Sequence, residues 1–276
     1  MKQRRTATLI AYAILILWVV IGVFPVFWSF LTSIKQTVDA LATPPVWTFA
    51  PDFSGYATLW DPDQENFGKY LYNTLFVAFF TVLISVTIGA LAGYALARYT
   101  SVGGFYLLMV ALIFRALPRM ALVMPYYYFG QTMGIYDTKF LLILVLVTIN
   151  QPFTIWMFRG FFKDVPESVD EAAMVDGCSR VSAFWHAILP LALPGAVTAS
   201  IFTLLLAYNE FLMPVVLTPH AAQTLPAAIA AFGADDPSKW TTAAAGGISI
   251  TLPIVVIVLC LQKFFVRGLT AGAVKG

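Results

Sequence analysis

Long apolar runs separated by short polar stretches make up most of this chain. A helix needs about 20 mostly apolar residues to cross the hydrocarbon layer, because no water is present there to satisfy its backbone. Six runs approach this length, and the third is the weakest because it contains Arg115, Pro118 and Arg119. The pattern therefore predicts an all-α, polytopic membrane protein that forms one transmembrane domain over residues 1–276. The predicted spans are residues 8–31, 71–97, 104–129, 140–158, 191–217 and 241–261.

Composition excludes a soluble domain. Hydrophobic residues fill 60% of the 276 positions and charged residues only 11%, with a mean hydropathy of +0.82. Ten Lys and Arg residues flank the spans on the side of the two termini, and four flank them on the other side. Because such an excess marks the cytoplasmic side, both termini are predicted to be cytoplasmic. The net charge of +2 reflects this topology and gives no reason to expect a nucleic-acid partner.

The first apolar run could be a cleaved signal peptide or a retained span. It is too long for a signal-peptide core and no small-residue cleavage pattern closes it, so a retained span is predicted. Cys178 and Cys260 fall in a cytoplasmic segment and in the last span, where no disulfide is expected. His186 and His220 lie on opposite sides of the membrane in this topology, so no metal site is expected.

Small residues recur every fourth position in the second span, at Ser85, Gly89, Gly93 and Ala97. This spacing places them on one helix face, where another backbone can approach closely. The pattern predicts a tight packing seam. It is compatible with static packing or with a face that slides against a partner helix.

Arg115, Arg119 and Glu210 are charged residues at predicted membrane depth, where charge is costly and is usually paired or functional. Glu210 follows Asn209 in the fifth span and needs a cationic or hydrogen-bonding partner, for which Arg115 is the nearest candidate in kind. Two interpretations are open. Either an ion pair ties the third span to the fifth, or Arg115, Asn209 and Glu210 line a translocation path.

A polar segment, residues 164–190, lies between the fourth and fifth spans. Pro166 suits a helix start, and Ser168 with Glu171 three residues later fits a capping box. Gly177 is expected to end this short helix, because glycine adopts the left-handed conformation without penalty. Ser179 or Ser182 is expected to start a second short helix.

The exposed residues of this hairpin are predicted to be mainly Glu167, Asp170, Glu171 and Asp176. An amphipathic hairpin lying on lipid would instead carry a basic polar face, since acidic residues are repelled by anionic lipid. A protein partner on the cytoplasmic side is therefore favoured over the bilayer surface.

The segment Glu171-Ala172-Ala173 with Asp176-Gly177, followed by Ile188-Leu189-Pro190, resembles the EAA loop of permease subunits of binding-protein-dependent ABC importers. Three further segments resemble the carbohydrate branch of that family, which includes the smaller permease of maltose importers. They are Arg159-Gly160-Phe161-Phe162, Asn209-Glu210-Phe211 and residues 268–276. The resemblance covers nearly the whole chain, is weakest over residues 32–69, and implies the type I ABC importer permease fold in a bacterial inner membrane.

The resemblance also implies partners. They are a second, different permease, a homodimeric cytoplasmic ATPase, an extracytoplasmic solute-binding protein and a sugar or sugar derivative. The EAA loop would be the coupling helix, and Glu171 would pair with a base in a cleft of the ATPase. The coupling residues implied are Glu171, Ala172, Ala173, Asp176 and Gly177.

The resemblance assigns roles to two further segments. The cytoplasmic tail, residues 266–276, would reach between the ATPase subunits through Gly268, Leu269, Thr270, Gly272 and Lys275. The external loop, about residues 218–240, would contact the binding protein through Pro226, Phe232 and Gly233.

The chain has no G-x-x-x-x-G-K-[ST] phosphate loop and no nucleophile, base or metal constellation. A non-catalytic subunit is therefore expected, with ATP and Mg²⁺ bound in the partner ATPase. An ion-coupled secondary carrier is the alternative, but it would need acids near the membrane midplane and usually internal repeats. Glu210 is one such acid, and the sequence shows no obvious repeat.

Overall fold

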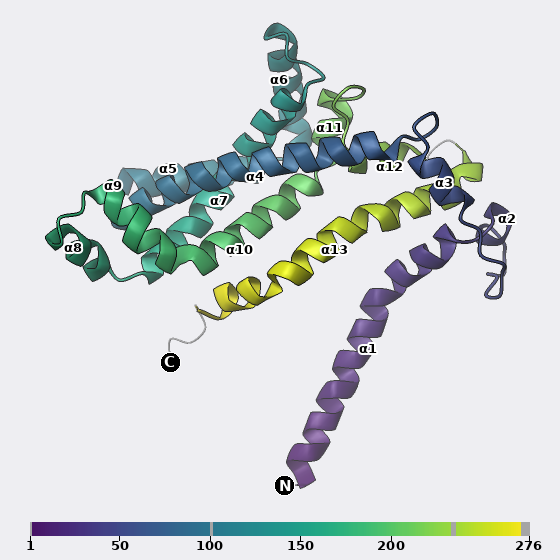
Figure 1. Ribbon diagram of the computed structural model, residues 1–276, viewed down its shortest axis with the longest axis horizontal. Coiled ribbons are helices and arrows are strands. Elements are labelled where there is room, and N and C mark those ends of the chain that lie inside the picture. Colours follow the sequence, from purple (N-terminus) through teal and green to yellow (C-terminus); the bar gives the residue numbers. More distant parts are fainter. Residues whose placement is uncertain (1, 100–101, 233–235, 272–276) are drawn as a thin grey trace. The chain divides into compact units, whose positions relative to one another are not determined.

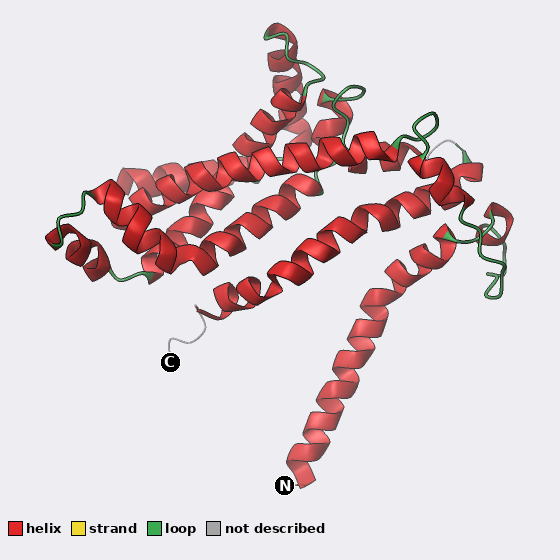
Figure 2. Ribbon diagram, viewed as in Figure 1, coloured by secondary structure: helices red, strands yellow, loops and turns green. Residues whose placement is uncertain are grey.

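A computed structural model of the chain describes residues 2–99, 102–232 and 236–271 (Figure 1). Within these residues all regular structure is helical, and Figure 2 shows loops only between helices. Five helices of the described part are long and apolar enough to cross a membrane, and a bent pair of helices forms a sixth span if it is counted as one. The predicted all-helical membrane fold is confirmed.

The chain divides into two compact units. The first comprises residues 1–69 and 228–253, and the second comprises residues 70–227 and 254–276. The helices that begin in the first stretch are α1 (Lys2–Ser33), α2 (Thr37–Ala40), α3 (Ser54–Trp60) and α4 (Phe67–Arg98). Near the other end of the chain, the boundaries between the units fall within α12 (Leu225–Phe232) and within α13 (Trp240–Ala271), and the 3₁₀ turn η2 (Pro237–Lys239) belongs to the first unit.

In the first unit, the segment after α1 is held against the start of α13. Lys239 forms an ion pair with Glu65, with 2.7 Å between Nζ and Oε1. A Cβ atom on Gly55 in α3 would lie 3.3 Å from the backbone of Thr241, so these two helices approach closely. Lys35 is buried, donates to the carbonyl of Val46 at 2.6 Å, and lies over aromatic rings that cover its side chain.

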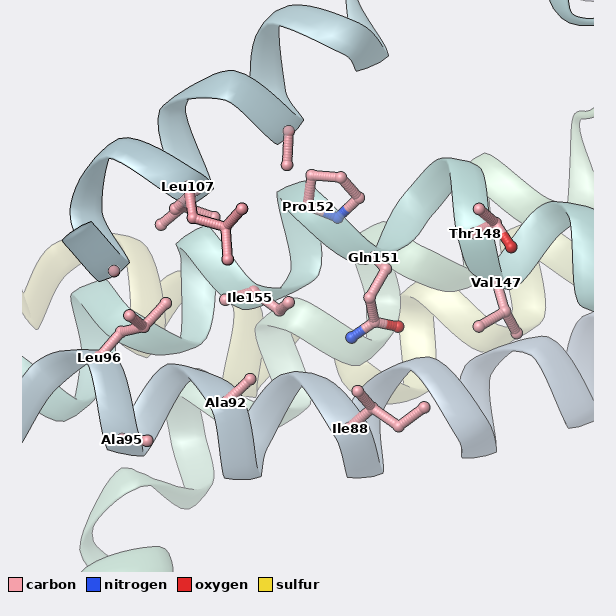
Figure 3. A pocket seen from close by; sticks show the side chains of 13 residues that line it. Ile88, Ala92, Ala95, Leu96, Leu107, Val147, Thr148, Gln151, Pro152 and Ile155 are labelled. Atoms are coloured by element: carbon pink, nitrogen blue, oxygen red, sulfur yellow. The ribbon is translucent and has the colours of Figure 1, made fainter.

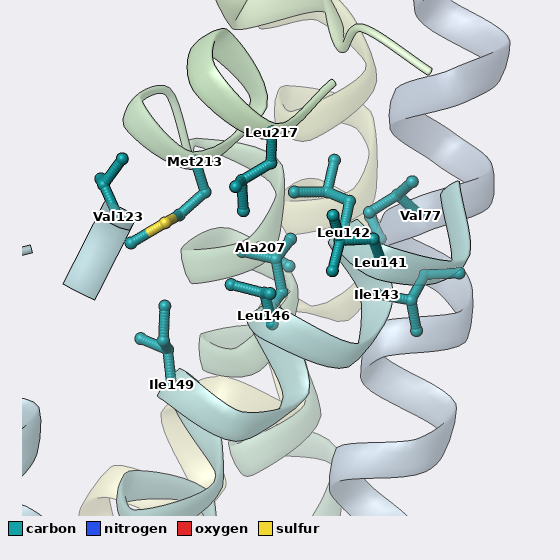
Figure 4. Packing of buried hydrophobic residues seen from close by; sticks show 12 residues of the cluster. Val77, Val123, Leu141, Leu142, Ile143, Leu146, Ile149, Ala207, Met213 and Leu217 are labelled. Carbon is teal, nitrogen blue, oxygen red and sulfur yellow. The ribbon is translucent and has the colours of Figure 1, made fainter. Parts of the chain in front are cut away.

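The second unit is built around α7 (Lys139–Asp164). It packs on α10 (Leu189–Tyr208), on α5 (Val102–Arg115) and on α11 (Leu212–Leu217), while α11 also contacts α6 (Arg119–Thr132). Figure 4 shows one core cluster in which side chains from α4, α6, α7, α10 and α11 meet. Its buried members include Val77, Val123, Leu142, Leu146, Ile149, Ala207, Met213 and Leu217.

A second core cluster lies farther along α4 and α7 and includes the start of α10. Its buried aromatic residues are Phe158 and Phe162 of α7 and Phe184, which precedes α10. Tyr94 of α4 packs its ring against Phe162 and Phe184, with centroids 5.6 and 5.0 Å away. This cluster is therefore the part of the core nearest to the polar segment between α7 and α10.

The small residues of α4 form the predicted packing seam, and the helix that packs on it is α7 of the same chain. A Cβ atom on Gly89 would lie 2.7 Å from the Thr154 side chain. On Gly93 it would lie 2.5 Å from Cβ of Phe158 and 2.9 Å from the backbone nitrogen of Arg159. Backbone atoms cannot rotate away as a flexible side chain can. Gly93 is therefore the position of the seam that least tolerates a side chain.

Two predicted spans are interrupted. The third, residues 104–129, consists of α5 and α6, which meet at an angle of 96°. Pro118 precedes α6, and its ring disfavours the helical conformation of Leu117. The fifth, residues 191–217, is interrupted between Tyr208 and Leu212, where Pro214 lacks the N–H that would bond to the carbonyl of Glu210.

The fourth predicted span ended at Phe158, but α7 continues to Asp164. The hydropathy pattern shows only where the apolar residues stop, whereas a helix continues for as long as its backbone hydrogen bonds are favourable. The end of α7 therefore extends beyond the predicted hydrocarbon layer and reaches the polar hairpin.

Replacement of Gly93 by Ala should destabilise the chain by about 1–3 kcal/mol, because the added methyl group overpacks the contact with α7. Gly160→Ala is the matched control, since a Cβ atom there has nothing within 4 Å. Thermal unfolding in detergent checks this, with a lower melting temperature expected for Gly93→Ala alone. Equal melting temperatures for the two variants would contradict the packing argument.

Candidate functional site

The hairpin between α7 and α10 contains two short helices, α8 (Glu167–Val175) and α9 (Arg180–Ala183). Gly177 ends α8 with φ +90°, as predicted. The N–H of Cys178 donates to the carbonyl of Ala173 at 3.0 Å, and the N–H of Gly177 donates to Met174 at 3.1 Å. This pair of bonds is the Schellman motif. A Cβ atom at Gly177 has nothing within 4 Å, so the requirement is conformational rather than steric.

The α8 helix begins directly after Pro166, as predicted, but it is capped differently. Pro166 occupies the N-cap position and no side chain caps the helix, so the capping box of Ser168 and Glu171 is wrong. Proline sets the backbone geometry there, and Glu167 and Asp170 in the first turn suit the positive end of the helix dipole. The second short helix begins after Ser179, whose hydroxyl accepts from the N–H of Ser182 at 3.2 Å.

One face of α8 is exposed. Glu171, Ala172 and Asp176 are exposed on it, together with Val175 at 87%. Ala173 is half-buried and Gly177 follows at the exposed end. The predicted acidic surface is confirmed for Glu167, Glu171 and Asp176. This face thus combines three carboxylates with the exposed aliphatic side chain of Val175.

Asp170 was expected on this surface, but it is only 8% exposed. Its carboxylate accepts from Nε of Arg98 at 2.8 Å and from the hydroxyl of Tyr94. Arg98 also donates to the carbonyls of Phe162 at 2.9 Å and Val165 at 3.1 Å. In the sequence, Arg98 is one of the ten basic residues that mark the predicted cytoplasmic side, and no contact was predicted for it. The available signal for this ion pair was the position of Arg98 at the end of an apolar span, on the same predicted side of the membrane as the acidic hairpin.

The hairpin continues directly into the membrane. The α9 helix leads into one π-helical turn, η1 (Phe184–Ile188), which leads into α10 without a loop, so that residues 180–208 form one span-length helical segment. The short stretches of residues 165–166 and 176–179 connect α8 to α7 and α9, and α8 also packs on α9 and η1. A displacement of the hairpin therefore acts directly on α10.

A second set of predicted residues lies where the helices are interrupted. Glu210, between α10 and α11, forms an ion pair with Arg119 at the start of α6. The proposed partner Arg115 lies instead over the ring of Phe153, 4.8 Å from its centroid. The predicted tie between the third and fifth segments exists, but Arg119 makes it, because the bend after Arg115 turns the chain between the two arginines.

Asn209 and Glu210 line an open pocket of about 500 Å³ together with Arg119. Asn209 is exposed and donates to the carbonyl of Leu205 at 2.9 Å, while the Glu210 side chain is 5% exposed. The other lining residues are apolar: Phe202, Leu205, Leu206, Phe211 and Leu212. The pocket thus offers amide, guanidinium and carboxylate groups beside an apolar wall.

A larger pocket of about 610 Å³ lies between α4, α5 and α7 (Figure 3). Its walls are almost entirely aliphatic, with Thr148 and Gln151 as the polar members. A polyhydroxylated ligand needs hydrogen-bonding groups to replace its lost hydration, so the smaller pocket near Glu210 suits such a ligand better.

The segment after α11 is held by residues that were not predicted to act there. Asp137 has φ 57°, and its carboxylate accepts from the N–H groups of His220, Ala221 and Ala222 at 2.8–3.4 Å. Asn73 donates to the carbonyls of Ala221 and Gln223 at 3.2 and 2.9 Å. The loop is therefore shaped by side chains of α4 and of the α6–α7 turn.

The predicted external loop, residues 218–240, contains the helix α12. Pro226 lies in its first turn and is half-buried, and Phe232 at its end is only 7% exposed. Gly233 lies outside the described residues. Phe232 thus does not offer a free contact surface here, because the loop folds back as an apolar helix instead of extending as an excursion.

The predicted tail is partly described. Gly268, Leu269 and Thr270 fall in the last turns of α13, which continues to Ala271. Gly272 and Lys275 lie outside the described residues.

Comparison with known proteins identifies the chain. Residues 85–271 match the family described as the binding-protein-dependent transport system inner membrane component. The chain belongs to this family. It is therefore a multi-pass permease subunit of the inner membrane.

Several relatives are similar over nearly their full length. The permease is 37% identical over 261 residues to the trehalose transport system permease protein SugB of Mycobacterium tuberculosis, covering 92% of this chain and 93% of the relative. It is 35% identical over 255 residues to the diacetylchitobiose uptake system permease protein DasC of Streptomyces coelicolor, covering 92% of each. A chain in the crystal structure of a bacterial ABC transporter involved in alginate import shares the fold, with a TM-score of 0.76 and 21% identity over 96% of this chain and 98% of that chain.

Replacement of Asp137 by Ala should loosen residues 218–224, because three backbone N–H groups lose their acceptor and the positive φ becomes less favourable. Asp137→Asn should have a smaller effect, since asparagine keeps an acceptor oxygen and tolerates this conformation. Hydrogen exchange of the loop amides measures it, with an increase of about tenfold expected for the alanine variant. Asp63→Ala, at an exposed acid in another segment, is the control. Unchanged exchange in Asp137→Ala would contradict the assignment.

Proposed function

We propose that this permease forms half of the translocation pathway of an ATP-driven importer for a sugar or sugar derivative. The relatives named for trehalose and diacetylchitobiose, each similar over about nine-tenths of both chains, support the substrate class. The second half of the pathway is a different permease. The exposed apolar faces of the spans are where such a partner packs; Trp18, Leu107 and Leu252 are exposed at 68%, 72% and 58%.

The observation that carries the proposal is the exposed face of α8, which is joined through α9 and η1 to α10. We infer that α8 is the coupling helix and that it docks in a cleft of a homodimeric cytoplasmic ATPase, where Glu171 meets a basic residue. ATP and Mg²⁺ are bound in that ATPase. Its closure biases the permease between two arrangements through contacts that differ in the two states.

The distribution of Lys and Arg supports an orientation with both termini and the hairpin in the cytoplasm. Within the second unit, α8 and α11 lie at opposite ends of α7 (Figure 1). The loop after α11 would then face outward, where a solute-binding protein delivers the sugar. Because Phe232 is buried, we infer that the segment shaped by Asp137 and Asn73, residues 218–224, forms this contact surface.

The pocket beside Glu210 is the proposed contribution of this chain to the path. The Arg119–Glu210 ion pair holds the ends of α6 and α10 together, and Asn209 supplies an exposed carboxamide to sugar hydroxyl groups. The two earlier interpretations are compatible: the ion pair is structural and the neighbouring amide lines the path. Arg115, which lies over Phe153, has no part in this pocket.

Glu171→Lys tests the coupling role in the reconstituted complex. Like charges held together at a protein interface cost several kcal/mol, so sugar uptake should fall at least about tenfold, with the ATPase lost or hydrolysing ATP without transport. Insertion in the membrane should be unchanged because no span is altered. Asp63→Lys is the matched charge reversal at an exposed acid outside the hairpin and should transport normally. Normal, coupled uptake by Glu171→Lys would show that α8 does not bind the ATPase as proposed.

A further inference from the structure

The guanidinium group of Arg98 joins three elements that are distant in sequence. Arg98 is the last residue of α4, and its Nε atom binds the carboxylate of Asp170 in α8. Its other two nitrogens donate to the carbonyls of Phe162 and Val165, at the end of α7. The last carbonyl groups of a helix have no intrahelical partner, so Arg98 satisfies two acceptors that would otherwise be left open.

The ion pair is protected from water. The Arg98 and Asp170 side chains are 7% and 11% exposed, so neither solvent nor salt screens the pair strongly. The hydroxyl of Tyr94 donates to the second carboxylate oxygen, and the ring of Tyr94 is packed between Phe162 and Phe184. Both oxygens of Asp170 are thereby bound to the same helix, α4.

Apart from this anchor, α8 is held by its packing on α9 and η1 and by Val169, which packs against the second core cluster. It is nine residues long, and isolated helices of that length are marginal in water. Asp170 directly precedes Glu171, so anchoring the Asp170 side chain determines which face of α8 is left exposed. The anchor therefore sets both the position of α8 and the direction in which Glu171 points.

We propose that Arg98, Asp170 and Tyr94 form a latch that transmits displacement of α8 to the ends of α4 and α7. This inference rests on the proposed coupling role of α8. With the latch closed, a push on α8 moves α4, α7 and α10 together. Without it, the push reaches α10 through α9 and η1, but α4 and the end of α7 receive it only through apolar packing such as that of Val169. These three are positioning residues, since they act through α8 and do not touch the ATPase or the sugar.

Tyr94→Phe is the mildest test, because it removes one hydroxyl and keeps the packed ring. Sugar uptake per ATP hydrolysed should fall about threefold, with complex assembly unchanged, since a hydrogen bond to a charged group is stronger than an ordinary one. Tyr136→Phe is the matched control: it removes a hydroxyl that donates to the carbonyl of Val216 at 3.1 Å, at the other end of α7.

The double variant Arg98→Met with Asp170→Leu removes the whole ion pair. Replacing both partners of a buried pair by apolar residues avoids the unpaired buried charge that a single replacement leaves, although the carbonyls of Phe162 and Val165 lose the donor that Arg98 supplies. The double variant should therefore assemble with its ATPase while uptake per ATP falls about tenfold or more. Arg98→Lys should lie in between, because lysine keeps the charge but lacks the planar fork that binds three acceptors.

A distance measurement distinguishes a role of the latch in positioning α8 from a role in the stability of the permease alone. Spin labels at Val175 and Leu91, exposed positions on α8 and α4, report the distance between these helices in the permease pair before the ATPase is added, because Val175 lies on the proposed docking face. A broader distance distribution in the double variant supports the latch. An unchanged distribution together with unchanged uptake per ATP would overturn it. If Glu171→Lys uncouples transport while the latch variants do not, the latch alone is wrong; if Glu171→Lys transports normally, the coupling role itself fails.

Discussion

The bonds made by Arg98 connect the membrane-embedded core of this permease to its exposed hairpin. One side chain satisfies the last carbonyls of α7 and pairs with the buried acid of α8, while its own helix, α4, packs against α7 through Gly93. The close helix contact and the charged anchor support each other. The contact brings the ends of α4 and α7 together, and the anchor gives their polar groups partners at that place.

The interruptions of α5–α6 and α10–α11 follow from the same requirement. Non-helical backbone at membrane depth is tolerated only where protein or a water-lined cavity satisfies it. Here the interruptions lie beside an open pocket with an apolar wall, and Arg119 and Glu210 neutralise each other in its lining. The interruptions that weaken the third and fifth segments as plain spans therefore also place Arg119, Asn209 and Glu210 together at one pocket.

Local chemistry made part of this structure predictable. The apolar runs, the stop at Gly177, the cap at Ser179 and the seam at Gly93 each depend on a few neighbouring residues, and sequence reveals such neighbours directly. The burial of Asp170 was not predictable in this way, because its partner lies 72 positions away. Likewise, the bend between α5 and α6 decides that Arg119 and not Arg115 binds Glu210, and hydropathy carries no information on the direction of a helix.

The central claim is that the exposed face of α8 is the docking surface for the ATPase. Labelling of a single cysteine at Val175, on a background with Cys178 and Cys260 replaced by serine, tests it most directly. The account predicts rapid labelling of the permease pair alone and at least about tenfold slower labelling once the ATPase is bound, because contact buries this 87% exposed position. A cysteine at Val38, 80% exposed on the opposite side in the predicted topology, should label equally in both cases. Equal labelling at position 175 with and without the ATPase would contradict the account.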